Sequence, residues 1–155
     1  MIVLRSLGDA DAPALRRVYS GASMPYLARS AMTLPDAERF VRRARRWAME
    51  VPVARYVLGA EHGRTLVGVV KLDRRPEAHG RVSYVFREDL WGRGHATDAV
   101  RELVSFAFTA AGFRSLGARH HPGNPASGRV LLKNGFLRLG LRDGLIEYRL
   151  EARAA

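Results

Sequence analysis

The sequence contains no cysteine, few acidic residues and no long hydrophobic run, and each absence excludes a class of function. A chain of 155 residues without cysteine forms no disulfide, offers no thiolate nucleophile and has no sulfur ligand for a metal. No apolar stretch comes near the roughly 20 residues that a membrane span requires. The first residues, Met1–Arg5, lack the basic-then-apolar layout of a signal peptide. We therefore expect a cytoplasmic protein that uses no metal and contacts no membrane.

Acidic residues are outnumbered, with 15 Asp and Glu against 26 Lys and Arg, which gives a net charge of +11. The excess could be a solvated surface of an arginine-rich chain. Alternatively, it could serve a polyanionic partner such as a phosphorylated cofactor, RNA or an acidic protein tail. It argues against a polycationic substrate, which the protein would repel. The hydrophobic share of 47% is typical of a globular domain, and we expect residues 1–155 to form one domain.

Apolar residues recur at strand and helix periods that predict seven strands and four helices in one mixed α/β domain. The strands are expected at 2–7, 53–60, 65–72, 81–87, 115–120, 136–141 and 145–150, and the helices at 9–19, 33–48, 96–111 and 126–134. The strands between 53 and 87 are separated by short turns and are expected to form an antiparallel meander. Residues 20–32 carry Gly21 and Pro25 without a clean period, so a loop or a broken helix is expected there.

A glycine-rich segment, Trp91–Thr97, reads WGRGHAT and lies between a strand pattern and a helical one. Glycines let the backbone approach a ligand closely, and the first N–H groups of a helix attract anions. The segment therefore predicts a phosphate or diphosphate site, to which Arg93 and the Thr97 hydroxyl add donors. It is not a dinucleotide fingerprint, because Thr97 replaces the third glycine. Nor is it a P-loop, because no Gly-Lys-Ser/Thr follows.

A second motif, Asn124–Phe136, reads NPASGRVLLKNGF. Together with the Trp91–Thr97 segment and the element order, it resembles the GCN5-related N-acetyltransferase (GNAT) superfamily, and within it the RimJ/RimL type. Members of that type share a Trp-Gly-x-Gly-x-Ala-Thr loop, an Asn-x-x-Ser helix start and a Lys-x-Gly-Phe helix end. They acetylate N-termini of ribosomal proteins, and the type also includes small-molecule acetyltransferases. The resemblance is specific over residues 81–137 and general elsewhere.

The resemblance implies a mostly antiparallel twisted sheet, splayed between its fourth and fifth strands, with acetyl-CoA or another acyl-CoA as the donor. In the family the strand before the glycine loop bulges, and the pantetheine arm pairs with its open edge. Backbone N–H groups of the loop hold the diphosphate. The implied donor-binding residues are Val85, Phe86, Arg87, Gly92, Arg93, Gly94, His95, Ala96, Thr97, Asn124, Ser127 and Arg129.

Three arginines, Arg87, Arg93 and Arg129, are alternatives for the 3′-phosphate of the donor. The N–H of a residue such as Phe86, in the strand before the loop, is predicted to stabilise the oxyanion that develops on the thioester carbonyl.

Two residues that many relatives use for proton transfer are replaced here. Leu131 stands where a tyrosine protonates the leaving thiolate, and Arg81 stands where a glutamate acts as base. We therefore take Ser127, His120 and Asn124 as the catalytic candidates, with Ser127 polarising the thiolate. A histidine titrates near about pH 6.5 and makes a credible base for the amine. The alternative for His120 is an ordinary surface residue at a strand end.

The acceptor is expected to be a primary amine, either a protein N-terminus or a small metabolite. Residues 20–32 fall where an acceptor lid would lie, and the candidate acceptor-binding residues are Ser23, Tyr26, Arg29 and Tyr84.

The arginine-rich helix Arg39–Arg46 is either a solvated face or a landing surface for phosphates, including RNA, tRNA or the ribosome. Two other functions stay open at this point. One is an aminoacyl-tRNA-dependent acyltransferase on the same fold, and the other is a non-catalytic module that binds CoA or RNA. We expect a monomer or a homodimer.

Overall fold

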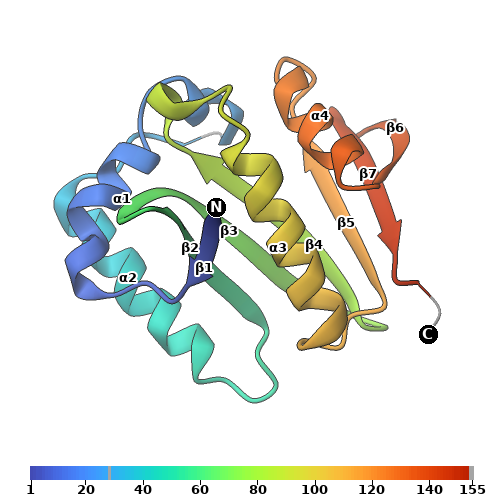
Figure 1. The fold of residues 1–155 in the computed structure, drawn as a ribbon, viewed down its shortest axis with the longest axis horizontal. Coiled ribbons are helices and arrows are strands. Elements are labelled where there is room, and N and C mark those ends of the chain that lie inside the picture. Colours follow the sequence, from blue (N-terminus) through green and yellow to red (C-terminus); the bar gives the residue numbers. More distant parts are fainter. Residues whose placement is uncertain (28, 154–155) are drawn as a thin grey trace.

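A twisted seven-stranded sheet runs through the protein in the order β1-β2-β3-β4-β5-β7-β6 (Figure 1). The computed structural model describes residues 1–27 and 29–153. Neighbouring strands are antiparallel except β4 and β5, which are parallel. The predicted seven-stranded, mostly antiparallel sheet is therefore confirmed. The strands are β1 (Ile2–Arg5), β2 (Arg55–His62), β3 (Thr65–Arg75), β4 (His79–Phe86), β5 (Ser115–His120), β6 (Leu137–Arg142) and β7 (Leu145–Glu151).

The α-helices are α1 (Ala12–Val18), α2 (Leu34–Ala48), α3 (His95–Thr109) and α4 (Pro125–Lys133). Short 3-10 segments are η1 (Asp9–Asp11), η2 (Gly21–Leu27) and η3 (Glu88–Leu90). With the seven-residue η2 counted, the described chain has five helices, one more than the four predicted. The coil of η2 is tighter than an α-helix, and it contains Pro25, which has no N–H to donate to a regular helical ladder.

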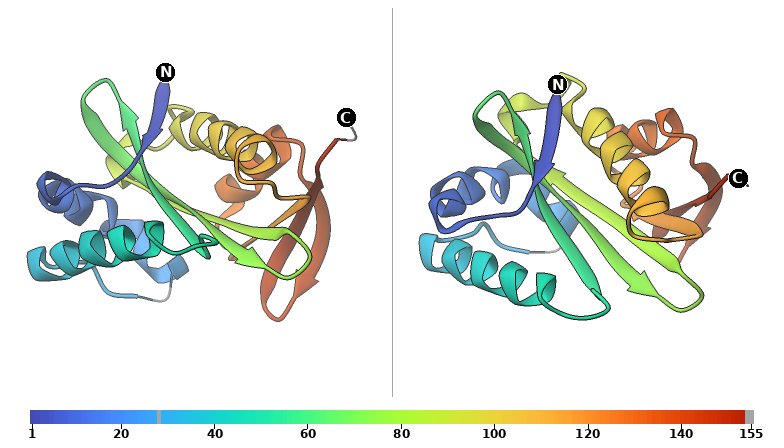
Figure 2. Two further views of the ribbon diagram at one scale, coloured as in Figure 1. Left: turned by 90° about the horizontal axis from the view of Figure 1, so that it is seen from below. Right: turned by 60° about the horizontal axis from the view of Figure 1, so that its bottom comes forward.

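The helices divide between the two faces of the sheet (Figure 2). Helices α1 and α2 bury Leu15, Val41 and their neighbours against β2 and β3, whereas α3 and α4 bury Leu103 and Leu131 on the opposite face. These two apolar clusters form the core. Helix α2 begins with a capping box, in which the Thr33 hydroxyl accepts from the Asp36 N–H at 3.2 Å and the Asp36 carboxylate accepts from the Thr33 N–H at 2.9 Å.

Strands β4 and β5 pair over four residues each and then separate. His79–Val82 pairs with Ser115–Ala118, and the rest of β4 has no partner on that side among the described strands. The predicted splay is thus confirmed. The bulge expected in β4 is not present, because the β3–β4 register is unbroken from Gly68↔Phe86 to Arg75↔His79.

The Phe86 ring packs directly over Gly68 on the neighbouring strand. A Cβ atom on Gly68 would lie 2.3 Å from Cδ2 of Phe86. Phe86, the last residue of β4, needs the space above Gly68. The glycine therefore lets β4 stay in register with β3 next to the gap between β4 and β5.

We expect Gly68→Ala to destabilise the fold by about 1–3 kcal/mol, because the Phe86 ring must move away from an overpacked site. Urea denaturation with tryptophan fluorescence measures the change. Gly8→Ala is the control, since its Cβ would lie no closer than 4.0 Å to the nearest atoms. Equal stabilities of the two variants would contradict this account of Gly68.

Candidate active site

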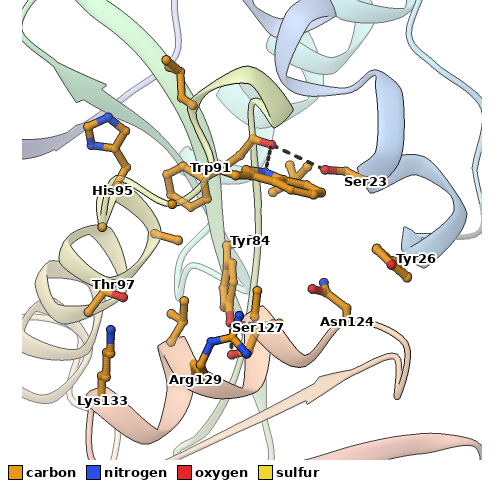
Figure 3. Close-up of a pocket in the computed structure, with 18 of the residues that line it drawn as sticks. Ser23, Tyr26, Tyr84, Trp91, His95, Thr97, Asn124, Ser127, Arg129 and Lys133 are labelled. Atoms are coloured by element: carbon orange, nitrogen blue, oxygen red, sulfur yellow. Dashed lines mark hydrogen bonds between the residues drawn. The ribbon is translucent and has the colours of Figure 1, made fainter.

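A cavity of about 280 Å³ lies where β4 and β5 separate (Figure 3). Four regions line it: η2, the end of β4, the loop leading into α3, and α4 with the loop before it. Thr97 and Lys133 lie at one end, Ser23, Tyr26 and Asn124 at the other, with Tyr84 between them. The lining residues are Ser23, Tyr26, Leu27, Tyr84, Val85, Phe86, Leu90, Trp91, Gly92, Gly94, His95, Ala96, Thr97, Asn124, Ala126, Ser127, Arg129, Val130 and Lys133.

The glycine loop presents backbone donors to one end of the cavity. Gly92 and Gly94 have φ of +82° and +80°, and a Cβ on either would meet nothing within 4 Å. The Asp98 N–H donates to the Gly94 carbonyl at 3.0 Å, so the preceding N–H groups of the first turn of α3 have no carbonyl one helical turn back. Arg129 and Lys133, one turn apart on α4, line the same cavity. This end is a cationic cradle for a phosphorylated group.

A pair of hydroxyl groups occupies the middle of the cavity. The Tyr84 hydroxyl lies 2.7 Å from Oγ of Ser127 and 3.1 Å from the Ser127 carbonyl oxygen, and its single proton can go to either acceptor. Burial raises the pKa of Tyr84 to about 12, although its hydrogen bond with Ser127 works in the opposite direction. Ser127 is in the first turn of α4, where the helix dipole favours negative charge.

The backbone of β4 leaves one N–H group facing the gap. The Arg87 N–H donates to the Val67 carbonyl at 2.9 Å on the β3 side. Since consecutive residues of a strand point their N–H groups in opposite directions, the Phe86 N–H faces the gap. The Phe86 carbonyl accepts from Trp91 Nε1 at 3.1 Å and from the Ser23 hydroxyl at 3.5 Å, and these bonds fasten the loop and η2 to the strand.

Segment η2 crosses the other end of the cavity and is tied on both sides. The Tyr26 hydroxyl donates to the Gly123 carbonyl at 3.0 Å, and the Tyr26 ring lies 5.4 Å from that of His121. The Ala22 N–H donates to the Glu88 carboxylate at 2.8 Å. The wall at this end is therefore held in place by neighbours from η3 and from the loop after β5.

Comparison with known proteins identifies the fold and the family. The model for the acetyltransferase (GNAT) domain matches residues 2–137. The chain belongs to the GNAT acetyltransferase family. It is 25% identical over 144 residues to the uncharacterized N-acetyltransferase YoaA of Bacillus subtilis, covering 90% of this chain and 81% of that protein. The family assignment makes this protein an acyl-CoA-dependent N-acetyltransferase.

Solved structures of similar fold include two with stated ligands. Mycobacterium smegmatis RimJ in complex with CoA-disulfide has a TM-score of 0.84 at 21% identity, over 97% of this chain and 82% of that one. Spermidine N-acetyltransferase from Vibrio cholerae, in complex with CoA and spermine, has a TM-score of 0.79 at 14% identity, over 97% and 95%. The fold is thus that of both a RimJ protein and a polyamine acetyltransferase.

Four predicted site residues lie outside the cavity lining: His120, Arg29, Arg87 and Arg93. His120 is 7% exposed, with Nδ1 2.8 Å from the His121 carbonyl and Nε2 3.1 Å from the Tyr148 hydroxyl. Helix α4 covers it, since a Cβ on Gly128 would lie 2.9 Å from its Nε2. With both ring nitrogens engaged, His120 is not positioned as a base for the amine. Arg29 places its guanidinium 4.8 Å from the centre of the Tyr19 ring rather than in the cavity.

The three arginines proposed for the 3′-phosphate of the donor are not equivalent. Arg87 and Arg93 line a neighbouring hollow with His62 and His95, and Arg87 is ion-paired with Asp89 at 2.7 Å. Arg129 alone of the three lines the main cavity.

Lys133 also lines the cavity, and the sequence analysis had noted it only as part of a motif. The signal for Lys133 was its spacing of one helical turn from Arg129.

Two further observations concern the part of the chain that the structure describes. None of its helices is long and apolar enough to cross a membrane. Nor does it hold a cluster of three or more His, Asp or Glu side chains placed to bind a metal ion.

Because burial raises the pKa of Tyr84 to about 12, we expect its phenol to stay protonated through the range near pH 10 where exposed tyrosines ionise. The stability that this group contributes is then present below about pH 10 and is lost as the pH rises through its folded-state pKa. When the tyrosinate absorbance of Tyr84→Phe is subtracted from that of wild type, the difference should stay constant up to about pH 11. A tyrosinate step in that difference near pH 10 would rule out the buried, hydrogen-bonded state.

Proposed function

We propose that this protein transfers the acetyl group of acetyl-CoA to a primary amine that is neutral or anionic overall. The observation that carries the proposal is a single cavity with three kinds of group in a row. A cationic, N–H-rich cradle lies at one end, a hydroxyl pair and a strand N–H lie at the gap between β4 and β5, and an opening bounded by η2 lies beyond.

The geometry of the cradle supports its assignment to the donor diphosphate. Space is open where Gly92 and Gly94 lack a Cβ, and the N–H groups that begin α3 have no helical partner. Arg129 and Lys133 would hold phosphate groups from the α4 side. The pantetheine arm would lie in the gap beside β4, where Val85 and Phe86 line the cavity and N–H and C=O groups of β4 lack a strand partner.

Acetyl-CoA supplies a thioester, which a neutral amine attacks at its carbonyl carbon. The Phe86 N–H faces the gap and would donate to the carbonyl oxygen as negative charge develops there. The proton that the amine loses would pass to water, since the cavity is open to solvent and His120 is buried outside it. Holding the two reactants in line supplies much of the acceleration.

The leaving thiolate would be stabilised by Ser127. When the Tyr84 phenol donates to Oγ of Ser127, the shorter of its two contacts, the serine proton is free to point into the cavity. Tyr84 itself is not a proton source for the thiolate: its pKa is raised to about 12, whereas a thiol such as cysteine has a pKa of about 8.5. The role of Tyr84 is to orient Ser127. Ser127 in turn takes over the role of the family tyrosine, whose position is occupied here by the fully buried Leu131.

The cavity lining favours an acceptor without multiple positive charges. None of the described lining residues is Asp or Glu, while Arg129 and Lys133 are cationic, and the chain carries +11 overall. A polyamine, the ligand named for the similar Vibrio cholerae enzyme, would be repelled. A protein N-terminus or a small acidic amine fits better, and another similar structure is named as a ribosomal-protein-S5-alanine acetyltransferase.

The arginine-rich face of α2 is not part of this cavity. Its exposed arginines include Arg39, paired with Asp36, and Arg45, paired with Asp9 at 3.3 Å. An RNA or ribosomal partner for Arg39–Arg46 stays a prediction. The family assignment favours an acyl-CoA donor over aminoacyl-tRNA and an enzyme over a non-catalytic module.

We expect Gly94→Asp to weaken CoA binding by about 100-fold, or about 3 kcal/mol, because a carboxylate would enter the phosphate cradle. Isothermal titration calorimetry measures the affinity. The matched control is Gly63→Asp, in a remote turn with a similar φ of +65° and nothing within 4 Å of its Cβ. If both variants bind CoA equally well, the cradle is assigned wrongly.

We expect Ser127→Ala to lower kcat by about 100-fold with little change in KM for acetyl-CoA, because a donor to developing charge is lost. Tyr84→Phe should reduce kcat less, by about tenfold, since Ser127 keeps its hydroxyl but loses its orientation. Thiol release measured with a chromogenic disulfide reports turnover, and a protein without cysteine gives no background. An unchanged kcat in Ser127→Ala would remove this serine from the chemistry.

A further inference from the structure

The face of the sheet opposite α3 and α4 is only partly covered. Helices α1 and α2 lie over its β1–β3 half, whereas no described helix packs below β5 and β7 (Figure 2). Leu72, Val82 and Ala118 point into the core under α3 and α4. Strand alternation therefore turns the residues next to them, including Lys71, toward the partly open face.

Four cationic side chains gather around this face. Lys71 on β3 is in register with the exposed Ser83 on β4, and Arg81 lies two residues before Ser83. Arg119 on β5 alternates with the buried Ala118, and burial together with neighbouring Arg119 lowers the pKa of Arg81. The Arg29 side chain stacks on Tyr19, the ring against which Lys71 also lies.

The carboxylates of the same face are fewer than these cations. Asp73 is held by Arg55 at 2.7 Å, and Glu147 is in register with Arg119 and lies 3.9 Å from Arg142. The face therefore keeps a net positive charge.

Lys71 is the least satisfied of these groups. Its Nζ lies 5.2 Å from the centre of the Phe40 ring and 5.8 Å from that of Tyr19. It has no ion pair or hydrogen bond to any residue that the structure describes. Burial, and then the neighbouring Arg55, lower its pKa, while Asp73 acts in the opposite direction. The Tyr19 hydroxyl is also buried without a partner among the described residues. The nearby Asp73 carboxylate is hydrogen-bonded to Arg55, so this mostly buried ammonium lacks an anion of its own, and a bound anion would reduce the cost of its burial.

We propose that Lys71, with Arg29 on the same Tyr19 ring, binds a carboxylate or phosphate group of the acceptor. The inference rests on the proposed acetyl transfer and names its substrate class: an amine that carries an anionic group.

The position of Lys71 sets the spacing of the two groups in the acceptor. Val85 lines the cavity beside the thioester position, and Ser83, level with Lys71, is two residues away on the same face of β4. Two residues of a strand span roughly 7 Å. The acceptor therefore holds its amine at the gap and its anionic group roughly 7 Å away over β3 and β4.

Matched acceptor pairs test the proposal. One pair is Ala-Asp amide against Ala-Asn amide, and the other is Ala-phosphoserine amide against Ala-Ser amide, so the two pairs distinguish a carboxylate from a phosphate. We expect wild type to prefer the anionic member of at least one pair by about tenfold or more in kcat/KM, chiefly through KM. In Lys71→Met we expect that preference to fall by about tenfold, and Lys71→Arg to restore part of it.

The control is Arg64→Met, in the exposed turn between β2 and β3, which should keep the wild-type preference. Lys71→Met removes a mostly buried charge, so its melting temperature should be no lower than that of wild type. A ratio near one for both pairs in wild type, or a preference that survives Lys71→Met, would overturn the inference while acetyl transfer stands. If CoA binds but none of the four amines releases its thiol, the proposed function falls and this inference falls with it.

Discussion

After Val82 and Ala118, strands β4 and β5 stop pairing, and everything in the site depends on this separation. An unpaired strand edge inside a sheet leaves N–H and C=O groups that require partners. In this protein the loop tryptophan and Ser23 bind one of them, the Phe86 carbonyl, and the Phe86 N–H faces an open cavity. Tyr84 spans the gap to reach α4. Catalysis in such a site relies on backbone groups and position more than on a strongly acidic or basic side chain.

Local sequence patterns predicted the features that depend on short-range chemistry. The apolar periods located all seven strands, and the helix predicted at 33–48 begins at Leu34 with Thr33 as its N-cap. The conformation of the glycine loop depends on a positive φ at Gly92 and at Gly94 and on the start of a helix. Both features can be predicted from the order of the residues in the loop. Motif spacing then brought Asn124 and Ser127 to the same cavity as that loop.

Features that depend on packing between distant segments were not predicted. His120 was expected to face the substrate, yet Gly128 lets α4 come down over it and Tyr148 takes its second nitrogen. The sequence around His120 gives no sign that Tyr148, on β7, is its neighbour. The bulge expected in β4 is missing because Gly68, on another strand, makes room for Phe86 without a change of register. Tyr84 belongs with Ser127 only because the splay brings β4 and α4 together.

The two ties on η2 link parts of the protein that are far apart in sequence. Ala22 is fastened to Glu88, just before the glycine loop, and Tyr26 is fastened to Gly123, beyond β5. A segment anchored on both sides moves only when its anchors move. The donor end and the acceptor end of the cavity are therefore joined through η2, and either hydrogen bond is a place where a change at one end would reach the other.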